Sequence, residues 1–223
     1  MKTPIIVVNL KAYAESTGKN ALEIAKTAKE VAKESKASIA VCCQATDITL
    51  VSKKVKIPVM AQHIDPVEQG SRTGWLTAEA VKEAGAVGTL INHSEHRLPF
   101  EEIRKALERA KQNKLTTIIC AKDDNEAEQL ASLEPDFIAV EPPDLIGGDV
   151  SVTTRPELVK NSVERVKRKN PKVKVLVGAG VKTKEDVAKA IELKADGVLL
   201  ASGVVKAADK RKVLKELAEG LRS

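Results

Sequence analysis

Four polar side chains that could do acid–base or electrophilic chemistry follow short apolar runs: Asn9, Lys11, His93 and Glu141. A carboxylate at such a position is costly to bury without a partner, which makes Glu141 the best candidate for a general base. The His93 imidazole can polarise a carbonyl or shuttle a proton, and the Lys11 ammonium can hold a phosphate or a developing oxyanion. Taken singly, each residue also fits an ordinary polar position at a turn. Together they predict proton transfer beside a stabilised negative charge.

Small residues follow two further apolar runs, in the segments 178–180 (Gly-Ala-Gly) and 201–203 (Ala-Ser-Gly). Side chains of this size let a ligand approach the backbone closely, and free N–H groups at a helix start attract anions. The residues expected to line a phosphate site are Gly180, Ala201, Ser202 and Gly203. By itself, such a site is common to many proteins that bind phosphorylated substrates.

The apolar runs have the length and composition of buried parallel strands, because they are rich in β-branched residues and apolar on both faces. Eight of them occur, at 5–10, 38–43, 58–61, 87–91, 116–121, 136–140, 173–177 and 197–200. Stretches with helical spacing lie between them, at 21–35, 45–52, 77–83, 126–133, 156–169, 184–193 and 209–221. Pro99 opens one more helix at its first turn.

Eight strand–helix units of about 25 residues each match a closed (β/α)8 barrel. An open doubly wound sheet would carry a glycine-rich fingerprint after its first strand, and residues 9–14 contain no glycine. The 223 residues are short for one barrel and contain no linker, so we expect a single domain over residues 1–223. In such barrels the C-terminal ends of the strands carry the chemistry, which would bring the polar residues to one mouth.

The composition excludes some classes of function and leaves others open. Aromatic residues make up only 2% of the chain, too few for the base-stacking surface of a single-strand nucleic-acid binder. The net charge of +6 fits either an anionic partner or a lysine-rich solvated surface, and nucleic-acid binding would not explain polar residues at three strand ends. No apolar run approaches the roughly 20 residues of a membrane span, and the run after Met1 is too short for a secretory signal.

The spacing of cysteine and histidine predicts neither a disulfide framework nor a metal centre. Cys42, Cys43 and Cys120 are odd in number and lack metal-type spacing, as expected of free thiols in the cytoplasm. His96 lies three residues after His93, but no further ligand of matching spacing completes a site. We therefore expect a cytoplasmic protein without a bound metal.

The polar residues and the small-residue segments occur together in a known family. The matching motifs are Asn9-x-Lys11, His93-Ser94-Glu95, Glu141-Pro142, Gly178-Ala179-Gly180 and Ala201-Ser202-Gly203. In this order, and over essentially the whole chain, they resemble the triosephosphate isomerase family, whose fold is the TIM barrel. The short chain and the segments 61–66 and 141–147 are similar to the archaeal branch of that family.

The resemblance implies interconversion of dihydroxyacetone phosphate and D-glyceraldehyde 3-phosphate through an enediol(ate), a reaction of glycolysis and gluconeogenesis. It implies that Glu141 moves the carbon-bound proton and that neutral His93 polarises the carbonyl. Lys11 and Asn9 would stabilise the negative charge of the enediolate and the phosphate. Glu95 would orient Lys11 without itself contacting the substrate. No metal or organic cofactor would be needed, because a base, an electrophile and a fixed cation suffice.

By the same resemblance, backbone N–H groups would hold the phosphate. They would come from Ile146 or Gly147 and from Gly180, Ser202 and Gly203. The loop after Glu141 would form a lid, in which residues 147–149 read Gly-Gly-Asp where the family usually has Gly-Thr-Gly. The missing hydroxyl predicts an altered closing equilibrium with activity retained.

The segment 65–76 is long for a barrel loop. By family resemblance it inserts into a neighbouring subunit, where Thr73 would come close to the partner's Asn9 and the partner's Lys11. This implies a homo-oligomer, with dimer contacts through the 65–76 loop and, as in archaeal relatives, a tetramer.

One other enzyme class fits a phosphate-binding barrel, an aldolase that uses Lys11 or Lys174 as a Schiff-base nucleophile. That chemistry needs a neutral lysine in an apolar setting. Lys11 instead stands near Asn9 and Glu95, whose polar groups favour a charged ammonium.

Overall fold

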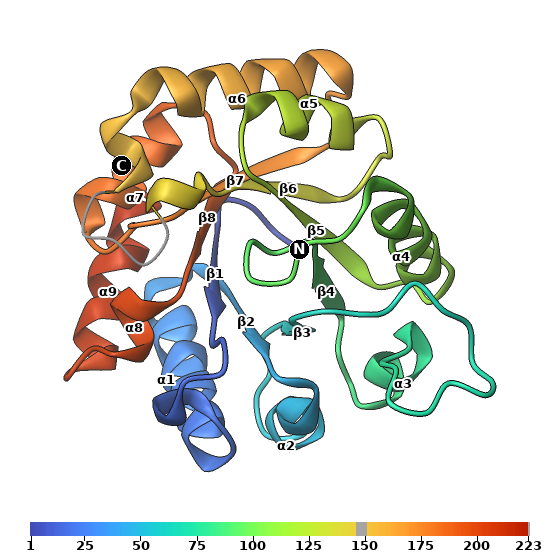
Figure 1. Cartoon of the computed structure of the whole chain (residues 1–223). Coiled ribbons are helices and arrows are strands. Elements are labelled where there is room, and N and C mark those ends of the chain that lie inside the picture. Colours follow the sequence, from blue (N-terminus) through green and yellow to red (C-terminus); the bar gives the residue numbers. More distant parts are fainter. Residues whose placement is uncertain (146–150, 223) are drawn as a thin grey trace.

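The computed structural model describes residues 1–145 and 151–222, and in this part of the chain eight parallel strands close into a barrel (Figure 1). The strands are β1 (Ile5–Asn9), β2 (Ser38–Cys43), β3 (Val59–Ala61), β4 (Gly88–Ile91), β5 (Thr116–Ala121), β6 (Phe137–Val140), β7 (Lys174–Gly178) and β8 (Gly197–Leu200). Each strand pairs with the next, and β8 pairs with β1 to close the ring. The predicted fold is confirmed, and each predicted strand is present with its ends within one residue.

Helices surround the barrel on the outside (Figure 1). The longer ones are α1 (Lys19–Ser35), α4 (Phe100–Gln112), α5 (Asp124–Ala131), α6 (Pro156–Lys169), α7 (Lys184–Glu192) and α9 (Lys210–Gly220). The short ones are α2 (Ile48–Ser52), α3 (Ala78–Glu83) and α8 (Ser202–Val205), with 3-10 turns η1 (Ala14–Ser16), η2 (Ala45–Asp47), η3 (Pro143–Leu145) and η4 (Val152–Thr154). No helix in the described ranges is long and apolar enough to cross a membrane.

Side-chain caps determine where several helices begin. Asp123 accepts a hydrogen bond from the backbone N–H of Glu126, so α5 begins at Asp124, two residues before its predicted start. Thr183 and Asp186 form a reciprocal capping box at the start of α7. These caps place each helix start at a defined distance from the preceding strand, which limits the paths open to the loops of the mouth.

Strand alternation divides the apolar core into an inner and an outer layer. On β1, Ile5 and Val7 belong to the cluster inside the barrel, whereas Ile6 packs outward against the helices. Cys42 and Cys43 separate in the same way, as their adjacent positions predict. The inner cluster comprises Ile5, Val7, Ala40, Cys42, Met60, Leu90, Ile118, Cys120, Phe137, Ala139, Leu176 and Leu199.

The inward rows of β1 and β6 continue into polar residues at the C-terminal end of the barrel. Asn9 follows Val7 by two residues, and Glu141 follows Ala139 by two. The period of two that buries the apolar side chains therefore also turns these polar groups into the mouth.

Candidate active site

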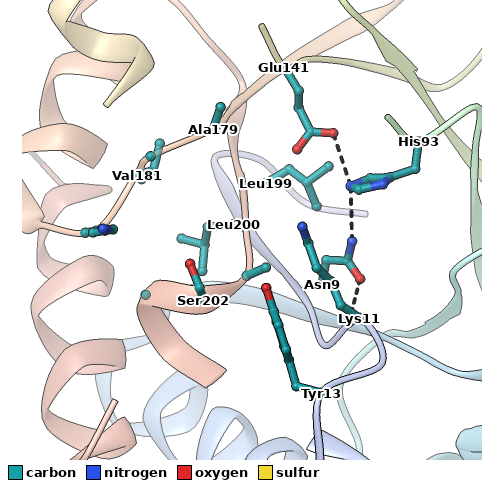
Figure 2. Close-up of a pocket in the computed structure, with 14 residues that line it drawn as sticks. Asn9, Lys11, Tyr13, His93, Glu141, Ala179, Val181, Leu199, Leu200 and Ser202 are labelled. Carbon is teal, nitrogen blue, oxygen red and sulfur yellow. Dashed lines mark hydrogen bonds and ion pairs between the residues drawn. The ribbon is translucent and has the colours of Figure 1, made fainter. Parts of the chain in front are cut away.

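The polar residues predicted from the sequence meet at the C-terminal mouth of the barrel (Figure 2). Asn9 ends β1, His93 lies two residues beyond β4, and Glu141 follows β6 directly. Lys11 enters from the loop after β1. All four line one cavity. Because the three strands are far apart in the sequence, closure of the barrel is what brings these side chains together.

Glu141 is buried, with 6% of its surface exposed, and its Oε2 atom lies 3.6 Å from Nε2 of His93. Burial raises the pKa of this carboxyl group, while His93, a hydrogen bond from the Cys120 thiol and the charge of Lys11 act in the opposite direction. Within the described residues, Oε2 has no hydrogen-bond partner. A carboxylate that is desolvated and incompletely paired is a stronger base than one in water.

One ring nitrogen of His93 is fixed as an acceptor. The backbone N–H of Glu95 donates to Nδ1 at 3.2 Å, so Nδ1 carries a lone pair and the proton of the neutral ring is on Nε2. Nε2 faces the cavity between Glu141 and Asn9, whose Nδ2 is 3.4 Å away (Figure 2). With the ring proton on Nε2, both nitrogens carry N–H groups, so an oxygen atom on the cavity side, within hydrogen-bond distance of each, would accept from both.

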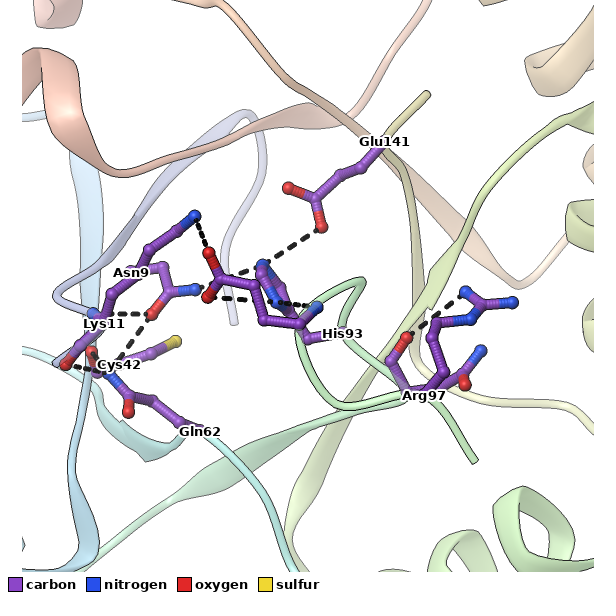
Figure 3. A network of polar contacts seen from close by, with 9 residues as sticks. Asn9, Lys11, Cys42, Gln62, His93, Arg97 and Glu141 are labelled. Atoms are coloured by element: carbon purple, nitrogen blue, oxygen red, sulfur yellow. Dashed lines mark hydrogen bonds and ion pairs between the residues drawn. The ribbon is translucent and has the colours of Figure 1, made fainter. Parts of the chain in front are cut away.

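The amide of Asn9 is oriented by Gln62 (Figure 3). Oδ1 of Asn9 accepts from the backbone N–H of Lys11 at 3.0 Å and from Nε2 of Gln62 at 3.2 Å, which leaves Nδ2 to face His93. Gln62 also donates to the carbonyl oxygens of Lys11 and Cys42, at 3.0 and 3.3 Å. Sequence reasoning missed Gln62, although the signal was available: a polar residue directly after an apolar strand.

Lys11 is constrained by its side chain and by its backbone. Its Nζ atom is 2.6 Å from Oε1 of Glu95, and only 12% of its side chain is exposed. Its φ of 52° is left-handed, which is uncommon outside glycine and turns the chain sharply after β1. The ion pair is the contact expected between Glu95 and Lys11, and it holds a positive charge at the cavity.

Asn92 determines how His93 enters the cavity. Leu90 faces the barrel interior, so alternation alone would send Asn92 inward and His93 toward the helices. Asn92 instead has a left-handed φ of 63°, which interrupts the alternation. Its buried side chain donates to the carbonyl oxygen of Cys120 and accepts from the backbone N–H of Leu98, both at 2.9 Å. Sequence reasoning missed Asn92, because the alternation of side chains along a strand does not show at which residue that alternation ends.

The other end of the cavity is lined by the small residues predicted to hold a phosphate. They are Gly180, Ala201, Ser202 and Gly203. In the described part of the chain, the N–H groups of Gly180, Ser202 and Gly203 donate no hydrogen bond. Unused N–H groups beside a cavity suit an anion. Tyr13 and Lys182 line the same cavity and were not predicted.

Space for the carboxylate depends on Gly178, at the end of β7. A Cβ atom at this position would lie 2.8 Å from Cγ of Glu141 and 2.8 Å from the carbonyl oxygen of Leu199. Any side chain here would therefore push Glu141 out of its place. The small residues at 178–180 predicted that another group approaches the backbone closely. At Gly178 that group is the side chain of Glu141, the candidate base.

Several predicted residues are not part of this cavity as described. The predicted lid residues Ile146, Gly147, Gly148 and Asp149 lie outside the described residues. Thr73 is exposed on the 65–76 loop and does not line the cavity of its own chain. Lys174, the alternative Schiff-base lysine, begins β7 at the opposite end of the barrel, where its Nζ donates to the carbonyl oxygen of Met1 at 3.2 Å.

His96 and the three cysteines singled out in the sequence are not among the residues that line this cavity. His96 stacks on His63, with ring centroids 4.2 Å apart, and does not face His93 as a co-ligand. Over residues 1–145 and 151–222, no group of three or more His, Cys, Asp or Glu side chains is placed to hold a metal ion. The three cysteines are free and buried, and burial raises the pKa of the Cys43 thiol to about 12.

Comparisons with known proteins agree with this geometry. The model of the triosephosphate isomerase family matches residues 4–218. A triosephosphate isomerase of Methanothermus fervidus is 49% identical over 218 residues, covering 97% of this chain and 98% of the relative, and one of Methanocaldococcus jannaschii is 48% identical, covering 96% and 98%. Among solved structures, triosephosphate isomerase from Bartonella henselae has the same fold, with a TM-score of 0.75 at 20% identity over 99% of this chain and 100% of that one. The chain therefore belongs to the triosephosphate isomerase family, whose members are aldose–ketose isomerases.

Proposed function

We propose that this chain interconverts dihydroxyacetone phosphate and D-glyceraldehyde 3-phosphate in glycolysis, with Glu141 as the base and His93 as the electrophile. The single observation that carries the assignment is the buried carboxylate, which lies 3.6 Å from Nε2 of His93 across a cavity. A base and an N–H donor so placed can act on adjacent atoms of one small substrate.

Glu141 takes a proton from the carbon next to the carbonyl. The electrons of that C–H bond form the carbon–carbon double bond of an enediolate, and the carbonyl π electrons move to oxygen. The pKa of Glu141, raised by burial, brings its basicity closer to that of the substrate carbon acid. Returning the proton to the neighbouring carbon, while His93 moves the hydroxyl protons, completes the isomerisation.

The negative charge that develops on oxygen has three donors available. Nε2 of His93 and Nδ2 of Asn9 are 3.4 Å apart and point to the same space, and the Lys11 ammonium lies beside them. Fixed donors of this kind stabilise an oxyanion without reorganising during the reaction. Glu95 acts on Lys11 and His93 from outside the cavity, through its carboxylate and its backbone N–H.

The phosphate of the substrate is assigned to the unused N–H groups of Gly180, Ser202 and Gly203, with Ala201 between strand and helix leaving room for it. Lys11 lies between the two ends of the cavity and can attract the phosphate dianion as well as the enediolate. The reaction described uses only residues of this chain, so we expect turnover without an added metal or cofactor.

A coupled assay with D-glyceraldehyde 3-phosphate on the purified protein tests the activity directly. Glu141→Asp tests the assignment of the base, because it retains the carboxylate but withdraws it by about 1 Å, for which a loss of about 100-fold in kcat is expected. Glu134→Asp is the matched control, since Glu134 is exposed and lies before β6 at the far end of the barrel. Full turnover by Glu141→Asp would show that another residue is the base.

We also propose that the chain acts as a homo-oligomer through the 65–76 loop. Asp65 supports this, because its N–H donates to the carbonyl oxygen of Leu76 at 2.8 Å while its Oδ2 accepts from the Leu76 N–H at 2.6 Å, which closes the base of the loop. Beyond this base, residues 68–75 are exposed, and Trp75 leaves 52% of its surface uncovered. An exposed tryptophan on a closed loop is typical of a contact surface.

Light scattering on the purified protein tests this assembly. We expect a dimer or a tetramer, and Trp75→Ser should shift the mass toward the monomer and lower activity, because Thr73 would no longer reach the partner's Lys11. A fully active monomer would contradict the proposal. The cytoplasmic location and the single domain over residues 1–223 stay predictions.

A further inference from the structure

Tyr13 is a cavity residue that the catalytic roles above leave unused. It lies two residues after Lys11, and it lines the cavity together with Ser202 and Leu200. Figure 2 shows its side chain rising into the cavity, with the hydroxyl beside Ser202 and Leu200 and Glu141 at the far side of the view. The phenol group is therefore at the end of the cavity assigned to the phosphate.

The position of the Tyr13 ring does not depend on its hydroxyl. The backbone carbonyl of Tyr13 accepts from the N–H and the Oγ–H of Ser16, at 3.0 and 3.2 Å, and from Oγ1 of Thr17 at 2.9 Å. Lys206 places its Nζ atom 4.6 Å from the centroid of the ring. These contacts hold the backbone and the ring face of Tyr13, and none of them involves the phenol oxygen atom.

The Tyr13 hydroxyl has no hydrogen-bond partner among residues 1–145 and 151–222. The oxygen atom is not among the buried polar atoms that lack a partner, so water reaches it, and a ligand oxygen in the cavity can take the place of that water. The polar groups near it in the cavity are donors: the Lys11 ammonium and the N–H groups of Ser202 and Gly203. Lys11 is paired with Glu95, but the two backbone N–H groups have no acceptor, and a cation beside unused N–H groups fits a ligand that carries several anionic oxygen atoms.

We propose that the Tyr13 hydroxyl donates a hydrogen bond to a phosphate oxygen of the substrate and so selects phosphate monoesters over unphosphorylated aldoses. The proposal rests on the proposed function. Lys182 lines the same end of the cavity, where its Cγ atom lies 3.3 Å from the position that a Cβ on Gly203 would take. The phosphate would then meet side-chain donors as well as backbone N–H groups.

Tyr13→Phe isolates the hydroxyl, because it retains the ring and its contacts. Inorganic phosphate is the probe, measured as a competitive inhibitor and by direct titration with 31P NMR. We expect phosphate binding to weaken about tenfold and KM for D-glyceraldehyde 3-phosphate to rise by a similar factor, as for the loss of one hydrogen bond to a charged group. Turnover of unphosphorylated glyceraldehyde should not change.

Thr17→Val is the matched control. It removes the hydrogen bonds that Thr17 makes with the Tyr13 carbonyl and with Gln44, but the two from Ser16 still hold that carbonyl, so phosphate binding should match that of the original chain. Unchanged phosphate binding in Tyr13→Phe would overturn the proposal, as would equal losses with glyceraldehyde and its phosphate, which would indicate a structural role.

The direct titration separates this proposal from the proposed function. If the original chain binds phosphate through Tyr13 but does not isomerise D-glyceraldehyde 3-phosphate, the phosphate contact stands and the isomerase assignment fails. If the chain isomerises the substrate and Tyr13→Phe binds phosphate as well as the original chain, the isomerase assignment stands and the Tyr13 contact fails.

Discussion

At the scale of single residues, the surroundings of Glu141 act on its pKa in opposite directions. Burial raises its pKa, and His93, Cys120 and Lys11 limit that rise, so the group stays ionisable while it becomes more basic. The same burial has a cost, because folding then favours the protonated form over the carboxylate. The residue assigned to catalysis is therefore one that destabilises the fold when it is charged.

Glu141→Gln should reveal this cost as a change of stability with pH. A carboxyl whose folded pKa is raised has no effect on stability below its ordinary value of 4.5, destabilises the fold increasingly from there up to the folded pKa, and has its full effect above it. We therefore expect Glu141→Gln to gain unfolding free energy, relative to the original chain, as pH rises from acid to neutral. Urea unfolding of the variant and the original chain, at acid and at neutral pH, measures the difference in unfolding free energy. A difference that is the same at the two pH values would contradict this expectation.

At the scale of elements, the loops after β4 and β5 are joined behind the cavity. Asn92 bonds the carbonyl oxygen of Cys120, Arg97 pairs with Glu126, and Glu126 accepts from the backbone N–H of Lys122 at 2.7 Å. These contacts hold the turn in which the backbone N–H of residue 95 is aimed at the imidazole of residue 93. The loop after β4 therefore sets the tautomer of His93, and its contacts with residues 120–126 hold that loop in place.

Asn92→Gly should loosen this arrangement while tolerating the left-handed backbone, because glycine adopts φ near 63° without strain. Losing both side-chain hydrogen bonds misplaces His93, so we expect kcat to fall about tenfold with little change in KM. Asn113→Gly, at the end of α4, is the control. The 15N shifts of the His93 ring report its tautomer, and a loss of kcat with unchanged shifts would exclude this mechanism.

At the scale of the whole molecule, closure of the barrel depends on the contact between the first and last strands. Gly197 begins β8 with φ of 150°, and a Cβ atom there would lie 2.1 Å from the carbonyl oxygen of Ile5. No side chain fits between β1 and β8 at this point. Closure in turn brings β8 beside β1, so the phosphate end of the cavity reaches Asn9 and Lys11.

Gly197→Ala should therefore destabilise the whole fold, by about 3 kcal/mol, through overpacking at the closing contact. Gly18→Ala is the control, because Gly18 also has a positive φ, of 61°, has no atom within 4 Å of an added Cβ, and lies outside the proposed 65–76 contact. Both variants place alanine at positive φ, and only Gly197→Ala adds a clash. Urea unfolding of both compares the two losses, and equal losses would show that the clash does not account for the effect.

The surplus of positive charge also belongs to the scale of the whole molecule. Basic residues are most closely spaced over 165–174, where Arg165 and Arg168 pair with Glu128 of α5 at 3.4 and 2.8 Å. These ion pairs favour a solvated surface over a nucleic-acid site as the explanation for that run. The charge that serves the candidate site is on Lys11, within the mouth.

Much of this protein follows from its sequence alone. Eight apolar runs with helical stretches between them determine a barrel, because each strand is buried on both faces and needs helices to cover it. The period of two then determines that Asn9 and Glu141 point inward, since they continue the rows of Val7 and Ala139. Short-range patterns suffice for these features because their causes are local.

Tertiary structure alone decided the rest. Gln62 orients Asn9, Asn92 redirects His93 and Gly178 makes room for Glu141, each through a contact between separate strands or loops. The position of Tyr13 beside Ser202 likewise requires β1 and β8 to be neighbours. Hydrogen bonds and steric limits of this kind depend on distances across the closed ring, and no periodicity along the chain encodes them.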